Sequence, residues 1–267
     1  SITISDLTID EYGIVPFGID VFGNALSGAV IDLGPKHSFE YENELRYYNV
    51  LSSGWDYTLG YSVDVGSYTT DINGSNCSFT TCEDADSYER SYWHNDDTGT
   101  SLKRWNAIMD LDGFGINLDV DLDLQVAPLF VSPGLKHSAS SPFSGDIDIA
   151  IPDYTVNVTD LTGSVKTTLK AGRWEQVKVT AGQFTALRID QSFQVKGDMD
   201  IELLDLIWGD HLDTPGTITM TITIKSWHVP EIGIVKVEES TTIRLTARRA
   251  GTLSDRYKNV FELVDYD

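Results

Sequence analysis

The sequence is short of basic residues, and this scarcity excludes some partners. It has 19 Lys and Arg against 41 Asp and Glu, which gives a formal net charge of −22. Such a charge repels phosphate backbones and anionic lipid headgroups over a Debye length. No run of about 18 apolar residues is present to span a bilayer, and the opening "SITISDLTID" lacks a signal pattern. We expect a soluble, processed form with no nucleic acid partner and no direct membrane insertion.

Cysteine is also scarce, with only Cys77 and Cys82 in the polar stretch "NGSNCSFTTCEDADSYE". No further Cys or His stands at a zinc-ligand spacing from them. A disulfide between the two would restrict the unfolded chain by about 2 kcal/mol, and it would persist only in an oxidising compartment. We therefore predict a disulfide and an extracytoplasmic location, in the periplasm, at the cell surface or secreted. Two free thiols are the alternative.

Recognisable catalytic patterns are missing as well. No HExxH pairing brings two imidazoles to one metal, and the nucleophile-elbow pattern GxSxG is absent. Carboxylate pairs are so numerous that no single pair identifies a glycosidase acid and nucleophile. We predict no catalytic residue, no metal and no cofactor. The histidines are scattered at His37, His94, His137, His211 and His228.

What the sequence has in abundance is alternation of apolar and polar residues. "GTITMTITIKSWHV" sets Ile218, Met220, Ile222 and Ile224 against four threonines. An apolar stripe at helical spacing is missing, apart from one short helix that 200–210 could form. Each strand then has one dry and one wet face. The expected fold is all-β and antiparallel, with a strongly curved sheet or incomplete β-barrel.

At 267 residues the chain is long enough for one large β domain or two smaller ones. No clean linker interrupts it, so a single continuous unit is preferred. Residues 1–44 are expected to form an N-terminal β segment that packs on or extends a main domain at 45–267. Within that domain we expect a strand at 55–65, a turn at Pro152 and Asp153, and a hairpin turn at Ala181 and Gly182.

The stretch "INLDVDLDLQV" at 116–126 carries a row of carboxylates, Asp119, Asp121 and Asp123. Ligands on one straight strand diverge, whereas calcium needs six to eight converging oxygens. The row is therefore predicted to face solvent while Leu118, Val120, Leu122 and Leu124 face the core. "DLDGFG" (110–115) and "DINGSN" (71–76) begin like calcium loops but have no Glu at the twelfth position, which favours turns.

Two further segments are informative because their residues match a pattern found in other proteins. "WEQVKVTAGQFTALRID" (174–190) and "SWHVPEIGIVKVEES" (226–240) resemble a loosely defined group of bacterial exported proteins and lipoproteins of uncharacterised function. The preceding stretches at 45–61, 91–102 and 126–146 are similar to the same group. The resemblance implies an exported β domain, and a weaker analogy of outline links it to the lipoprotein carriers LolA and LolB. The matched residues are Val179, Ala181, Gly182, Phe184, Leu187 and Arg188, with Trp227, Pro230, Gly233, Ile234, Val235 and Lys236.

Our first functional hypothesis is a non-enzymatic exported protein whose concave apolar face binds a hydrophobic small molecule or a segment of an envelope protein. An apolar cavity is expected between strands 55–65, 184–195 and 218–227, although side chains could instead fill this interior. The candidate ligand-binding residues are Tyr57, Leu59, Tyr61, Phe184, Phe193, Met220 and Ile222.

Two alternatives belong to other classes. The first is a cell-surface structural protein that self-assembles by adding its N-terminal strand to a neighbouring sheet. The second is a glycan-binding or glycan-active module with a surface patch at Tyr92, Trp93 and His94 in "SYWHNDD". For that cluster a strand end followed by a turn at Asn95–Gly99 is the preferred interpretation.

Overall fold

A computed structural model describes most of the chain after residue 38, and strands account for 93% of the described residues. Those residues include no helix, so the all-β prediction is confirmed. The described part of the chain therefore has no helix with the length and apolar character to cross a membrane. The described ranges are 39–49, 54–58, 62–65, 70–83, 88–96, 98–111, 114–128, 131–151, 154–205, 211–229, 233–249 and 251–266.

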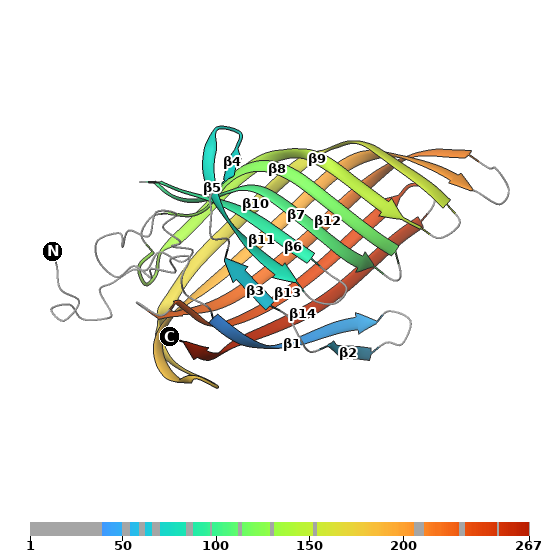
Figure 1. The fold of residues 1–267 in the computed structure, drawn as a ribbon. Helices are drawn as coiled ribbons and strands as arrows, with labels where there is room; N and C mark the ends of the chain where they lie inside the picture. The colour runs from blue at the N-terminus through green and yellow to red at the C-terminus, as the bar shows by residue number, and fades with distance from the viewer. Residues whose placement is uncertain are drawn as a thin grey trace.

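The described residues form 14 strands, which lengthen toward the C-terminal half (Figure 1). The first seven are β1 (Phe39–Asn49), β2 (Gly54–Thr58), β3 (Ser62–Val65), β4 (Thr70–Ile72), β5 (Ser75–Glu83), β6 (Tyr88–Asp96) and β7 (Gly99–Leu111). The rest are β8 (Phe114–Pro128), β9 (Lys136–Ala150), β10 (Tyr154–Val179), β11 (Gly182–Asp205), β12 (His211–Val229), β13 (Gly233–Ala247) and β14 (Gly251–Tyr266).

All the pairings are antiparallel, and sequence neighbours are mostly sheet neighbours. The strand order is β2-β1-β14-β13-β12-β11-β10-β9-β8-β7-β6-β5-β3, with β4 paired to β5 beside this path. The single large sheet is not closed into a barrel. Its two edges in the described chain are β2, which pairs with β1, and β3, which pairs with β5.

The positions of β2 and β3 show how strongly the sheet curves. These strands are the two edges of the sheet, yet only three residues of chain separate Thr58 from Ser62. Four Cα to Cα steps span at most about 15 Å, so the edges must lie near each other. β1 and β3 are indeed in contact. The long strands curl round one interior (Figure 1), and the expected curved, incompletely closed sheet is confirmed.

The same geometry corrects one sequence prediction. Residues 55–65 were expected to form a single strand along the cavity, but the chain leaves one edge of the sheet after β2 and enters the other edge at β3. The apolar alternation continues across residues 59–61, so it carried no sign of this break. At the N-terminal boundary, β1 runs across residue 44 and pairs with β14, which places residues 39–49 in the main sheet. Residues 1–38 lie outside the described ranges.

Of the turns predicted in the C-terminal half, the hairpin at Ala181 and Gly182 is confirmed. β9 ends at Ala150 and β10 begins at Tyr154, while Pro152 and Asp153, where the other turn was predicted, lie outside the described residues. Val179 pairs with Gly182 across a tight hairpin, where Gly182 has a φ of 146° that a side chain would strain. Since every strand alternates, the sheet has an inner face, the side of Ile218 and Met220, and an outer face, the side of Thr219 and Thr221.

A second, smaller core lies where the tip of the β10–β11 hairpin reaches across to β14. The amide of Ala181 donates to the carbonyl of Leu263 at 2.9 Å, and Leu263 is fully buried. The indole Nε1 of Trp227 donates to Glu175 at 2.6 Å, and the Lys236 ammonium lies 5.7 Å from the Trp227 ring. Residues of the segments 174–190 and 226–240, the two that resemble bacterial exported proteins, therefore pack together here. Their roles in this core are structural.

The aspartate row faces outward, as predicted. Leu118, Val120 and Leu124 are buried, whereas the Asp123 side chain is 71% exposed. Cations of β7 pair with the row: Lys103 donates to Asp123 at 2.6 Å, and Arg104 binds Asp119 through both Nε and Nη2. The row is one side of a set of ion pairs on the wet face of the sheet.

Candidate ligand-binding cavity on the inner face

The inner face encloses a mainly apolar cavity of about 170 Å³. Its walls come from strands at distant places in the sheet order, from β6 to β13, so they face one another across the curled interior. Two tryptophans, two phenylalanines and branched aliphatic residues supply most of the surface. The lining residues are Ser91, Trp93, Leu102, Trp105, Leu118, Val120, Leu122, Phe143, Val165, Phe193, Val195, Ile218, Ile222, Ile224 and Glu239.

A buried polar contact fixes one end of this interior. The Gln191 side-chain amide on β11 donates to the Val126 carbonyl at 3.1 Å and to the Thr167 hydroxyl at 3.2 Å. This contact holds the end of β8 against β11, although β8 pairs with β9 only as far as Leu122. Val126, Ala127 and Val131 are completely buried there. They fill the space beside the cavity and define its limit.

Two polar residues interrupt the apolar wall. Ser91 is buried on β6, and Glu239 lies on β13, where its Oε1 accepts a hydrogen bond from the Thr241 hydroxyl at 2.9 Å. A carboxylate in an apolar wall favours a ligand group that donates hydrogen bonds and disfavours another carboxylate. The cavity therefore has the character of a site for one apolar segment of an amphipathic molecule.

The inner alternation of β12 continues beyond the cavity to a buried histidine. His228 has no exposed surface, and its Nε2 lies 2.7 Å from the Ser226 hydroxyl. Desolvation by burial lowers the pKa of His228 to about 3, so the ring is neutral at physiological pH. No described residue hydrogen-bonds its Nδ1. Sequence reasoning gave this histidine no role, because its burial depends on the fold.

The structure separates the predicted ligand-binding residues. Phe193 and Ile222 line the cavity, while Met220 is buried in the adjoining core. Phe184 packs instead on the second core around Trp227. The remaining three predictions, the side chain of Tyr57 and the whole of Leu59 and Tyr61, lie outside the described residues. Sequence reasoning did not identify Trp93 and Trp105 as cavity residues. Both belong to alternating apolar and polar stretches, but only the curling of the sheet brings them into the same cavity as Phe193.

The predicted surface patch is also divided between the two faces. Trp93 lines the cavity, whereas Tyr92 pairs in register with Arg104. His94 Nε2 lies 3.8 Å from Asp96. A hydrogen bond from the Thr98 hydroxyl, assisted by the amides of Thr98 and Gly99, lowers the pKa of Asp96. Asp96 thus organises the turn between β6 and β7, which confirms the strand end and turn expected at Asn95–Gly99.

The predicted disulfide is not formed. Cys77 is a buried free thiol, and burial is the main cause of its raised pKa. Cys77 and Cys82 lie on the same strand, β5, whose rise of about 3.3 Å per residue separates their Cα atoms by roughly 16 Å. A disulfide requires less than about 7 Å. The polar stretch looked like a flexible loop, but β5 pairs with β6 and β3 and is extended.

A cluster that could offer ligands to a cation lies at the far end of β11 and β12. His211 Nε2 lies 2.6 Å from Glu202 and 3.6 Å from Asp213. The hydrogen bond to Glu202 raises the pKa of His211, and hydrogen bonds from Asn157 and then His211 lower the pKa of Glu202. All three groups are solvent-exposed. We assign the cluster as an exposed ion pair closing the strand ends.

Fold and cavity together define a class: an all-β protein with one curled antiparallel sheet and an apolar interior. In comparisons with known proteins, no family model, curated protein or solved structure matched the chain.

Proposed function

We propose that this is a non-enzymatic, exported binding protein that holds the apolar part of a ligand inside its curled sheet. The observation that carries the proposal is the inner cavity of about 170 Å³, walled by Trp93, Trp105, Phe193 and Ile222. Export is supported by the resemblance of 174–190 and 226–240 to bacterial exported proteins. The disulfide no longer supports it.

The volume of the cavity limits the ligand. An engineered protein cavity of about 150 Å³ binds benzene, whereas drug-sized ligands occupy about 300–1,000 Å³. The cavity therefore accepts one ring or one segment of an acyl chain. Because Glu239 is part of the wall, the preferred ligand has a hydroxyl or amine near its apolar part. A long-chain alcohol should then bind more tightly than the fatty acid of equal length.

A titration with a hydrophobic fluorescent probe tests the proposal. We expect saturable binding at one site and displacement by long-chain alcohols. Ile222→Trp should abolish it by filling the cavity, whereas Thr221→Trp places the same indole side chain on the outer face of the same strand and should leave it intact. Equal binding by the two variants would contradict the proposal.

Glu239→Gln sharpens the assignment of the ligand class. Removing the carboxylate charge should narrow the difference in affinity between the alcohol and the fatty acid, because the repulsion of the second carboxylate is lost. If the wild type instead binds the fatty acid more tightly than the alcohol, Glu239 does not face the bound head group and that part of the proposal fails.

A further inference from the structure

The outer face of β9–β14 carries charge of the opposite sign to the chain as a whole. We define the outer sheet patch as every second residue, the outward-facing one, in one range of each strand from β9 to β14. The strand registers align these ranges side by side, and the range on β9 is 136–144. All of its members are exposed or partly exposed. The corresponding ranges on the other strands are 162–170, 190–198, 217–225, 238–246 and 252–260.

Cations outnumber anions in the outer sheet patch by eight to three, a net charge of +5 in a chain of −22. The anions are Asp190, Asp198 and Glu238. Five cations lie on β9–β12, at Lys136, Lys166, Lys170, Lys196 and Lys225, and three on β13 and β14, at Arg244, Arg256 and Lys258. At physiological ionic strength the Debye length is about 8 Å, so a bound chain senses these local charges more than the distant acidic groups.

Two of the three acidic members of the patch, Asp190 and Glu238, are paired with cations within the sheet. Arg188 donates to Asp190 at 3.0 Å, and Glu238 lies 3.5 Å from Lys236 and 3.6 Å from Lys225. By contrast, Lys166, Lys170 and Lys196 form no ion pair with any described residue. Lys136 pairs directly with Lys170 across β9 and β10, a cross-strand arrangement of like charges that an anion between them would relieve. On the other side of Lys170 the register places Asp190 of β11, so Lys136 is the lysine of this pair that has no acidic residue opposite it in the described sheet.

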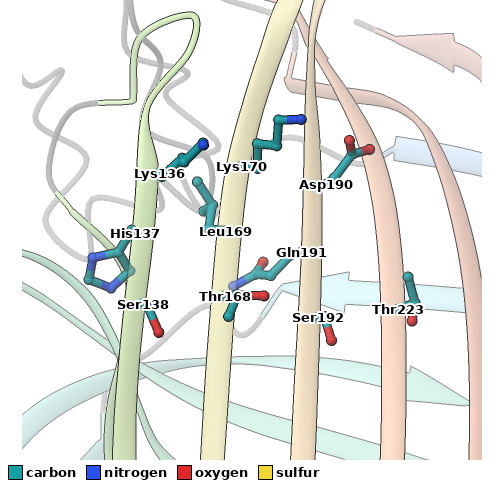
Figure 2. A pocket seen from close by; sticks show the side chains of 10 residues that line it. All are labelled: Lys136, His137, Ser138, Thr168, Leu169, Lys170, Asp190, Gln191, Ser192 and Thr223. Carbon is teal, nitrogen blue, oxygen red and sulfur yellow. The ribbon is translucent and has the colours of Figure 1, made fainter.

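This lysine pair borders an open depression of about 440 Å³. Figure 2 shows Lys136 and Lys170 above a row of hydroxyl side chains from four adjacent strands. The row comprises Ser138, Thr168, Ser192 and Thr223, which the registers place side by side. Hydroxyls of this kind both donate and accept hydrogen bonds, as sugar hydroxyls do.

From these observations we propose that the outer sheet patch binds an acidic polysaccharide. Lysines contact its carboxylates, and the Ser and Thr residues that occupy more than half of the patch contact its ring hydroxyls. Cations two strands apart, such as Lys196 and Arg244, are about 10 Å from each other, a spacing suited to an extended chain with repeated charges. The site is separate from the inner cavity and from Tyr92, Trp93 and His94.

Other anionic partners fit the patch less well. The patch has no aromatic side chain on which nucleic acid bases could stack. Its only apolar members are Pro142 and Val260, so it has no apolar surface to insert into a lipid bilayer. The proposal is therefore specific for an anionic polymer rich in hydroxyl groups.

Binding of the full chain to immobilised polygalacturonate tests the proposal, with dextran as the uncharged counterpart. We expect saturable binding at 0.15 M salt that is lost at 1 M, and no binding to dextran. Lys166→Glu with Lys196→Glu should weaken the affinity at least tenfold. Lys178→Glu with Arg249→Glu makes the same change in net charge outside the patch and should alter it less than twofold.

Lys166→Gln with Lys196→Gln removes the charges without reversing them and should weaken binding to an intermediate degree, with an unchanged melting temperature. Equal weakening by the patch and control variants would overturn the proposal. So would equal affinity for dextran, or tighter binding to duplex DNA or to vesicles of anionic lipid.

Discussion

The inner and outer faces of β9–β14 are made from alternate residues of the same strands, yet their chemistry is opposite. On β12, Ile218 and Met220 are 2% and 3% exposed, while Thr219 and Thr221, which alternate with them, lie in solvent. The inner face is mainly apolar, with Glu239 as the charged residue of the cavity wall, whereas the outer face gathers positive charge and hydroxyls. The comparison shows that one period-two pattern can specify two separate surfaces of contrasting chemistry.

Gly163 offers the strongest way to break the inner face. An added Cβ would overlap the carbonyl oxygen of Lys196 and the ring of Phe143, so this position has room only for glycine. Gly163→Ala should lower the free energy of unfolding by about 1–3 kcal/mol through overpacking. Ser164→Ala, its neighbour on the outer face, should change it by less than about 0.5 kcal/mol. Urea denaturation measures both, and similar losses would show that the faces are not distinct.

His228 makes the stability of the inner face depend on pH. Its folded pKa of about 3 lies below the unfolded value of 6.5, so the unfolded chain binds the extra proton between these values. Stability is therefore complete above pH 6.5 and falls with decreasing pH, by about 1.5 kcal/mol between pH 6.5 and 5. His228→Gln should remove this loss in denaturant titrations at the two pH values. If the free energy of unfolding of the variant fell between pH 6.5 and 5 as much as that of the wild type, the burial of the histidine would be contradicted.

His211 is the exposed counterpart and acts in the opposite direction. Its pKa is raised by Glu202, so its contribution is present below the unfolded pKa and lost as pH rises through the folded one. His211→Gln should leave the acid-side loss caused by His228 in place. If His211→Gln abolished that loss, the assignment to His228 would be wrong.

Arg104 tests the small contribution that an ion pair on the outer face makes to the free energy of unfolding. Its two contacts with Asp119 are partly exposed, and the exposed class of ion pair contributes about 0.2–1 kcal/mol. Arg104→Ala should cause a loss in this range, one that shrinks at high salt.

Asn replacement of Asp119, Asp121 and Asp123 should leave any effect of calcium on the melting temperature unchanged. A large loss of calcium stabilisation would identify a metal site in the row.

The smallest expected effect concerns the two cysteines. Because Cys77 is a free thiol, adding reductant should not change the melting temperature. Alkylation of the unfolded, non-reduced protein should label both Cys77 and Cys82. A mass showing no labelled thiols would mean that β5 is not the extended strand described.

Alternation was sufficient to predict the strand content, the orientation of the aspartate row and the hairpin at Ala181 and Gly182, because each depends on local chemistry. It could not predict that 55–65 divides between opposite edges of the sheet, since the pattern persists across the break. Nor could it show that Trp93 and Phe193 line the same cavity, because that depends on the curvature of a sheet whose strands are far apart in sequence.

The disulfide prediction was wrong, and the net charge could not show how charges are distributed over the surface. A net charge of −22 averages over the chain and conceals the outer sheet patch, which forms only when register aligns Lys136, Lys166 and Lys196 on one face. The short spacing of Cys77 and Cys82 suggested proximity, but an extended strand separates residues five positions apart. The disulfide prediction treated distance along the sequence as distance in space.

Tryptophan fluorescence gives the most direct test of the inner cavity, because Trp93 and Trp105 are part of its wall. A long-chain alcohol carrying bromine, a contact quencher, should quench the protein with saturation at one equivalent. Replacing both residues with Phe should abolish the quenching, whereas Trp174→Phe with Trp227→Phe should retain it. Quenching that never saturates, or that survives the loss of Trp93 and Trp105, would contradict the assignment of the inner face as a ligand site.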